Sequence, residues 1–121
     1  METYTIALAT RLKRKVFRAR NIPDDVIAIA REEVSRQDAA LISYEVFDYG
    51  IVLYVGCRDR DAAIQIADSV RRATSGPIRH KYPELWKMPS LWNSRPLIEE
   101  GGAGPGNDKK VSEYYESLKS R

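Results

Sequence analysis

Basic side chains gather in two stretches of the sequence, and their spacing suits the neutralisation of phosphate groups. Six of the ten residues from 11 to 20 are basic, and none of the ten is acidic. The first stretch contains Arg11, Lys13, Arg14, Lys15, Arg18 and Arg20, and the second contains Arg71, Arg72, Arg79, Lys81 and Lys87. Lysine and arginine clusters of this kind bind nucleic acids mainly through the phosphate backbone. All of these residues except Arg20 and Lys87 are our predicted nucleic-acid contacts, although a charge run can also be a merely solvated surface.

Aromatic residues are interleaved with the second basic stretch. Tyr82, Trp86 and Trp92 have the arrangement that single-strand-binding proteins use to stack nucleobases. The alternative is a small core beneath a long loop, which we favour more for Trp92 than for Trp86. His80 is the only histidine, and we expect it to be a surface residue or a phosphate contact rather than a catalytic group.

Length and composition predict one domain with one core. The chain has 121 residues, and its formal charge of +3 is unevenly distributed, because acidic residues predominate between positions 24 and 61. Cys57 is the only cysteine, so no intrachain disulfide can form, and we expect a buried thiol and a reducing, cytoplasmic location. The apolar runs are too short for a signal peptide or a membrane span, so neither secretion nor membrane insertion is predicted.

Hydrophobic periodicity predicts an α+β fold. We expect strands over residues 3–10, 40–47, 51–57 and 97–99, and helices over 23–36 and from a cap at Asp61 to a break at Gly76 and Pro77. Asp48, Tyr49 and Gly50 form a turn-like segment that predicts an antiparallel hairpin. The order strand, helix, strand, strand, helix, strand is that of a ferredoxin-like antiparallel sheet with two packing helices.

The C-terminal third contains the least regular segments. Residues 78–94 include two tryptophans and several prolines and are predicted to form an ordered loop. The glycine-rich residues 101–107 predict a flexible linker, after which Asp108 caps a terminal helix that ends near Leu118. We therefore expect a domain over residues 1–100, and a helix over residues 108–121 that belongs to the same domain.

Four groups of residues occur in a particular order along the chain. They are the basic segment 10–17, which ends in Phe17; residues 70–75 with Tyr82-Pro83-Glu84-Leu85; Leu91-Trp92-Asn93 with residues 97–101; and Val111-Ser112-Glu113-Tyr114. In order and spacing they resemble the single-tyrosine HUH transposases of small bacterial and archaeal insertion sequences, which include the REP-associated transposases. The resemblance covers most of the chain, although no single motif is specific.

This resemblance implies a function and a set of site residues. Family members bind a folded single-stranded DNA hairpin as a dimer. Two histidines on a central strand and a polar residue on the last helix hold Mg²⁺ or Mn²⁺, which polarises the scissile phosphate, and a helix tyrosine attacks it. Tyr114 matches that catalytic tyrosine. The resemblance thus implies a DNA partner, single-stranded or hairpin, and a homodimer.

The metal ligands of the family are missing here. The positions that match the histidines are Gly50 and Val52, or Tyr49 and Ile51 if the alignment shifts by one residue, and the polar helix position is Leu118. We therefore predict that no metal is bound and that metal-dependent cleavage is lost. Glu45, Asp48 and Glu99 could in principle form a carboxylate site for Mg²⁺, but no spacing requires it.

Tyr114 has two interpretations. It matches the nucleophile, but it also belongs to an apolar helix face with Val111, Tyr115 and Leu118, and without metal ligands we favour packing or stacking on a base. The main hypothesis is a transposase-like DNA-binding protein that has lost cleavage. The alternatives are an active transposase with a rearranged site that forms a tyrosine–DNA intermediate, and a non-catalytic protein-interaction or oligomerisation module.

Overall fold

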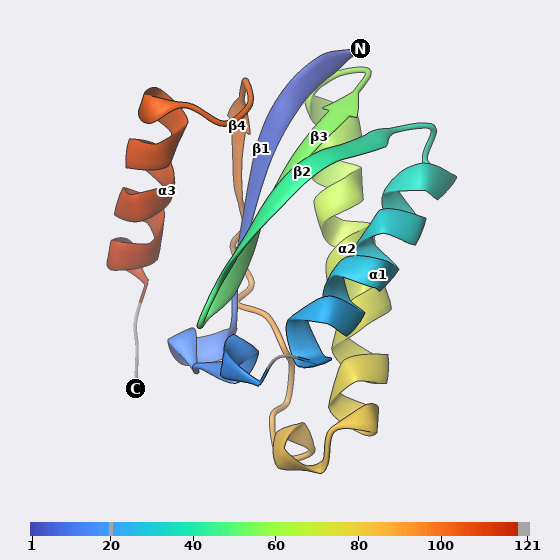
Figure 1. Cartoon of the computed structure of the whole chain (residues 1–121), viewed down its shortest axis with the longest axis vertical. Helices are drawn as coiled ribbons and strands as arrows, with labels where there is room; N and C mark the ends of the chain where they lie inside the picture. The colour runs from blue at the N-terminus through green and yellow to red at the C-terminus, as the bar shows by residue number, and fades with distance from the viewer. Residues whose placement is uncertain (20, 119–121) are drawn as a thin grey trace.

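The computed structural model describes residues 1–19 and 21–118, so Arg20 of the first basic stretch and residues 119–121 of the expected terminal helix lie outside the described residues. The helices and strands follow one another from end to end of the chain (Figure 1). In chain order they are β1 (Glu2–Ala9), η1 (Arg11–Lys13), η2 (Val16–Arg18), α1 (Asn21–Arg36), β2 (Ala40–Phe47), β3 (Gly50–Cys57), α2 (Arg60–Lys81), η3 (Pro83–Leu85), β4 (Leu97–Glu100) and α3 (Pro105–Ser117).

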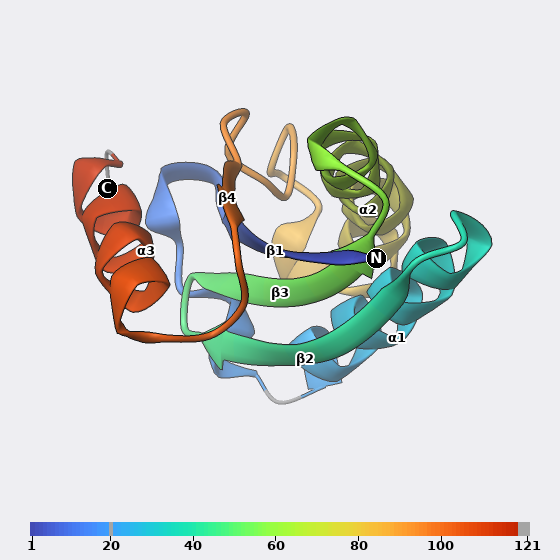
Figure 2. The ribbon, with the colours of Figure 1, turned by 90° about the horizontal axis from the view of Figure 1, so that it is seen from above.

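The four strands form one antiparallel sheet in the order β2-β3-β1-β4. The expected hairpin is present, because β2 and β3 pair directly and Asp48 and Tyr49 make the turn between them. Helices α1 and α2 cover one face of the sheet, while α3 lies on the opposite face (Figure 2). The predicted α+β, ferredoxin-like fold with an additional C-terminal helix is therefore confirmed.

Side chains alternate between two cores, one on each face of the sheet. On β1, Ile6 and Leu8 point toward α1 and α2, whereas Ala7 and Ala9 belong to the smaller core beneath α3. This alternation is the period of two that strand geometry imposes on side chains. Every residue of β3 is buried, including Cys57 at its end, as expected for a central strand covered on both faces.

Helix α2 does not end at Gly76 and Pro77, which corrects the expected break. It continues to Lys81, and it begins at Arg60 after Asp59, whose carboxylate accepts a hydrogen bond from the Ala62 N–H at 2.9 Å. Asp61 is therefore not its cap. A proline disfavours helical geometry in the preceding residue partly through that residue's Cβ, which glycine lacks. Burial of Ile78 in the larger core then stabilises the last turn.

The glycine-rich segment is shorter than expected. Helix α3 begins at Pro105 after an N-cap at Gly104, three residues before the predicted start at Asp108. The Gly101 N–H donates to the Thr3 carbonyl at 2.8 Å, and Asn107 Nδ2 lies 3.0 Å from the carbonyls of Glu100 and Gly102. Asn107 therefore attaches the start of α3 to the end of β4. No helix in residues 1–19 and 21–118 has the length and apolar character needed to cross a membrane.

Candidate functional site

The first basic stretch forms a compact loop at one end of the sheet. Antiparallel pairing of Ala9 with Gly50 brings the residues after β1 next to the β2–β3 turn. The Thr10 hydroxyl lies within hydrogen-bonding distance of the Arg14 and Tyr49 carbonyls, at 2.6 and 3.1 Å, and the Phe17 N–H donates to the Asp48 carbonyl at 2.9 Å. These bonds fix η1 and η2 against the turn.

Only some of the predicted contacts in this loop are available to a ligand. Lys13 donates to the Tyr115 carbonyl at 2.8 Å, and its ammonium lies 5.3 Å from the centre of the Tyr49 ring. Arg18 forms an ion pair with Asp48 at 3.2 Å. Within the described part of the chain, no side-chain partner engages the exposed residues Arg11, Arg14 and Lys15. These three are the cations best placed to meet phosphates.

All residues of the second basic stretch except Lys87 lie on α2, and most of its predicted contacts stabilise the fold. Arg71 donates to the carbonyls of Asn93 and Ser94 at 3.3 and 2.8 Å, and it pairs with Asp68 at 2.8 Å. Arg79 likewise donates to carbonyls of Ser75 and Met88, at 3.0 and 2.8 Å.

Lys81 is also engaged within the protein. It pairs with Asp25 at 2.7 Å, and hydrogen bonds from Lys81 and then from Tyr82 hold the pKa of the Asp25 carboxyl below its usual range. Arg72 alone of the four predicted α2 contacts is exposed without a side-chain partner among residues 1–19 and 21–118.

Two open hollows lie along one stripe of α2. Asp68, Arg72, Ser75 and Arg79 recur at intervals of three and four residues, so they share a helix face. The larger hollow, of about 480 Å³, is lined by Asp68, Arg71, Arg72, Ser75, Ser90, Trp92, Asn93 and Ser94. The smaller, of about 380 Å³, is lined by Gly76, Arg79, His80 and Trp86. His80 lies in the last turn of α2 and not in the loop that was expected over residues 78–94.

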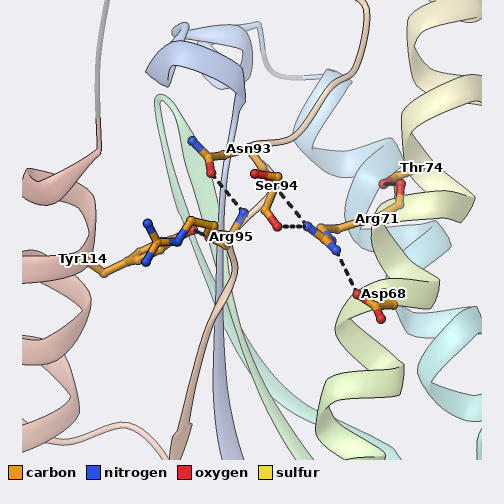
Figure 3. Close-up of polar contacts among 7 residues, drawn as sticks. All are labelled: Asp68, Arg71, Thr74, Asn93, Ser94, Arg95 and Tyr114. Atoms are coloured by element: carbon orange, nitrogen blue, oxygen red, sulfur yellow. Dashed lines mark hydrogen bonds and ion pairs between the residues drawn. The ribbon is translucent and has the colours of Figure 1, made fainter.

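Tyr114 and Arg71 reach the same loop from opposite sides of the sheet (Figure 3). The Tyr114 hydroxyl donates to the Arg95 carbonyl, the Arg95 N–H donates to Asn93 Oδ1 at 3.0 Å, and Arg71 binds the carbonyls of Asn93 and Ser94. Burial raises the pKa of Tyr114 to about 12, although Arg71 and Arg95 partly oppose this shift. The phenol is thus protonated at neutral pH and is a weak nucleophile.

Of the two residue pairs that could align with the family's histidines, Gly50 and Val52 lie in the core beneath α3, whereas Ile51 of the shifted pair belongs to the larger core. Gly50 and Val52 are buried, and both face α3. The Tyr115 hydroxyl lies next to Gly50 and is 3.1 and 3.2 Å from the carbonyl oxygens of Leu8 and Ile51. The donor set contains no side chain that binds a divalent metal, and an aromatic ring fills the space, so the residues present do not fit the family's metal.

The three carboxylates that were considered as a possible Mg²⁺ site are not brought together by the fold. Glu45 on β2 and Glu99 on β4 lie on opposite edges of the sheet, where they bond Tyr54 and Lys110, while Asp48 pairs with Arg18. No three histidine, cysteine, aspartate or glutamate side chains in the described ranges are grouped to hold a metal ion. These three carboxylates therefore do not lie together as one site.

The two tryptophans differ in burial, and the roles of three other residues were not found from the sequence. Trp92 is buried and its indole N–H donates to Thr74 at 2.8 Å, which agrees with the core interpretation, whereas Trp86 is exposed. The sequence placed Tyr115 only on the apolar face of the terminal helix and gave no sign that its hydroxyl would lie beside the carbonyls of Leu8 and Ile51. Asn93 and Ser94 bind Arg71 through their backbone carbonyls, which give no signal in the sequence.

Comparison with solved structures shows a shared fold. No protein-family model and no curated protein sequence matches the chain. The crystal structure of a provisionally assigned transposase from Deinococcus radiodurans R1 aligns with a TM-score of 0.85 at 16% identity, covering 98% of this chain and 92% of the other.

Two other solved structures are more distant. The C-terminal domain of MgtC from Mycobacterium tuberculosis aligns with a TM-score of 0.52 at 9% identity, covering 87% of this chain and 93% of that one. A REP-associated tyrosine transposase bound to a REP hairpin aligns with a TM-score of 0.48 at 8% identity, covering 91% and 62%. At these identities the comparisons show that the chain and the Deinococcus protein have the same fold.

Proposed function

We propose that this protein is a transposase-like DNA-binding protein that binds single-stranded or hairpin DNA and no longer cleaves it. The observation that carries the proposal is the position of its exposed cations. The loop with Arg11, Arg14 and Lys15 lies at the same end of the molecule as the C-terminal part of α2 (Figure 1). A cationic end with an exposed tryptophan beside it is suited to a DNA strand. Likeness over nearly the whole chain to a provisionally assigned transposase supports the same proposal.

The core beneath α3 supports the proposed loss of cleavage. A metal-assisted attack needs ligands near the scissile phosphate and a nucleophile that can lose its proton. Neither pair of residues that could align with the family's histidines, Gly50 and Val52 or Tyr49 and Ile51, supplies a histidine, and Tyr115 fills the space next to Gly50. Tyr114 is protonated at neutral pH and donates its hydrogen to a backbone carbonyl. We therefore assign Tyr114 a packing role.

Fluorescence anisotropy with labelled hairpin, single-stranded and duplex DNA at several salt concentrations tests DNA binding. We expect the hairpin and the single strand to bind more tightly than the duplex, with affinity falling log-linearly as salt increases, because phosphate contacts release counterions. Absence of binding to all three DNAs at low salt would overturn the proposal and favour the interaction module.

A covalent-adduct assay tests the loss of cleavage. Wild-type protein and the Tyr114→Phe variant are incubated with labelled hairpin DNA in Mg²⁺ or Mn²⁺ and separated under denaturing conditions. We expect no adduct from either protein. An adduct formed by the wild type and abolished by Tyr114→Phe would show that the active-transposase alternative is right.

We further propose that the protein forms a homodimer through the outer edge of β2. This edge strand carries four large apolar residues that are 37–58% exposed, namely Ile42, Tyr44, Val46 and Phe47. Such an edge readily pairs with another strand, and two copies related by a twofold axis can pair antiparallel. Sedimentation equilibrium should give a dimer that Val46→Lys dissociates. Ile64→Lys, at a similarly exposed position on α2, should remain dimeric.

A further inference from the structure

Trp86 is exposed yet held in a fixed position. It is 63% exposed, while its indole N–H donates to the His80 carbonyl at 3.0 Å and its backbone N–H donates to the Pro83 carbonyl at 3.1 Å. The one polar group of the indole is therefore already satisfied. What the side chain offers to a ligand is the face of its ring, which is the part that stacks on another aromatic system.

The turn that carries Trp86 is fixed to α2 by the side chain of Arg79. The guanidinium connects the carbonyl of Ser75 on α2 with that of Met88 after the turn, and Leu85 and Met88 are buried in the larger core. Because the turn is anchored before any ligand arrives, little conformational entropy is lost when a ring stacks on Trp86.

Positive charge surrounds this exposed ring. Trp86 lines the smaller hollow together with Gly76, Arg79 and His80, and the exposed Lys87 follows it in sequence. Arg79 uses Nε and Nη1 for its two carbonyls, and within the described residues no protein acceptor is bonded to Nη2. The hollow therefore presents a flat apolar surface for a ring and a cationic wall for an anion.

We propose that this hollow binds one unpaired nucleobase of a DNA strand, stacked on Trp86, with the adjoining phosphate near Arg79. This inference rests on the proposed DNA-binding function and adds the position that recognises an unstacked base. The larger hollow lies farther along the same stripe of α2 and is lined by exposed Arg72, which offers a cation for the next phosphate of the strand.

The test compares two oligonucleotides of equal length, an oligothymidylate and an abasic strand that has phosphates but no bases. Trp86→Ala should weaken oligothymidylate binding about ten-fold, which lies within the range that one base–aromatic stack typically contributes. The affinity of Trp86→Ala for the abasic strand should equal that of the wild type. Trp86→Phe keeps a stacking ring and should restore most of the oligothymidylate affinity.

Tryptophan fluorescence gives a second readout in the same titration. Oligothymidylate should quench the wild-type emission, because stacking brings a base against exposed Trp86. It should leave Trp86→Phe unquenched, because the remaining Trp92 is buried. If the wild type binds both strands and Trp86→Ala binds oligothymidylate equally well, this inference is wrong and the DNA-binding proposal stands. If the wild type binds neither strand, both are wrong.

Discussion

The hydroxyl group of Tyr115 occupies the space that a side chain on Gly50 would need. A Cβ added to Gly50 would lie 2.7 Å from the Tyr115 hydroxyl oxygen and 2.5 Å from the carbonyl oxygen of Leu8. In one of the two alignments with the resembled transposases, Gly50 takes the place of a metal-binding histidine. The tyrosine next to the expected nucleophile therefore excludes a ligand side chain from this point on β3.

Gly50→Ala should destabilise the protein by about 1–3 kcal/mol, the usual cost of overpacking a core. Urea unfolding measures the difference. Gly56→Ala on the same strand is the matched control, because its Cβ would meet only the side chains of Ile42 and Met1 at 3.6 and 3.8 Å. Equal unfolding midpoints for the two variants would contradict the packing described here.

Tyr115→Phe should lower the free energy of unfolding by about 1 kcal/mol, the typical net contribution of a hydrogen bond. The ring and its edge-to-face contacts with Phe47 and Tyr49 remain, so only the hydroxyl is lost. Chemical denaturation compares it with Tyr44→Phe, whose ring is exposed on β2. A larger loss for Tyr44→Phe would show that the Tyr115 hydroxyl is not a significant anchor.

Stability should fall at alkaline pH as Tyr114 ionises. Its pKa is raised from 10 in the unfolded chain to about 12 in the folded protein, mainly by burial. The stabilisation that folding gains from the protonated Tyr114 phenol is therefore complete below pH 10 and is lost as the pH rises from 10 through 12. The stability difference between wild type and Tyr114→Phe should decrease across this range. The tyrosinate absorbance of folded wild type minus that of folded Tyr114→Phe reports on Tyr114. If this difference titrates near pH 10, the raised pKa of Tyr114 is contradicted.

Arg14→Ala combined with Lys15→Ala should weaken single-stranded DNA binding and reduce its salt dependence. Removing two phosphate contacts should lower the slope of log affinity against log salt by about 1.4 for a single strand. Arg58→Ala combined with Arg60→Ala removes the same charge just after β3, roughly 20 Å away along the strands. Identical slopes for both double variants would mean that the charge acts without a defined site.

Asn107→Ala should destabilise the attachment of α3. Its side-chain nitrogen lies 3.0–3.2 Å from Thr5 Oγ1 and from the carbonyls of Glu100 and Gly102. Loss of these bonds should cost about 1–2 kcal/mol and should speed amide exchange in α3 more than in α1. Lys109→Ala, at an exposed position of the same helix, is the control. Unchanged exchange in Asn107→Ala would support the flexible linker that the sequence predicts.

Local sequence patterns determined the order of the helices and strands and the fold class of this protein. Strand alternation, the Asp48–Tyr49 turn and the periodicity of the helices predicted the order of elements and the ferredoxin-like fold, because each pattern arises within a few neighbouring residues. Because the only histidine is residue 80, the sequence also establishes that β3 carries none. The expected end of α2 at Pro77 was wrong because burial of Ile78, a tertiary effect, stabilises a turn that propensity disfavours.

Tertiary structure decided which of the predicted residues are available. The sequence supplied nine candidate cations. Folding placed carbonyls or carboxylates against Lys13, Arg18, Arg71, Arg79 and Lys81, although Nη2 of Arg79 has no protein acceptor among the described residues, and it left Arg11, Arg14, Lys15 and Arg72 exposed without side-chain partners. It also packed Tyr115 against carbonyls 107 and 64 residues away along the chain. Contacts over such separations depend on how the elements assemble, so local patterns cannot specify them.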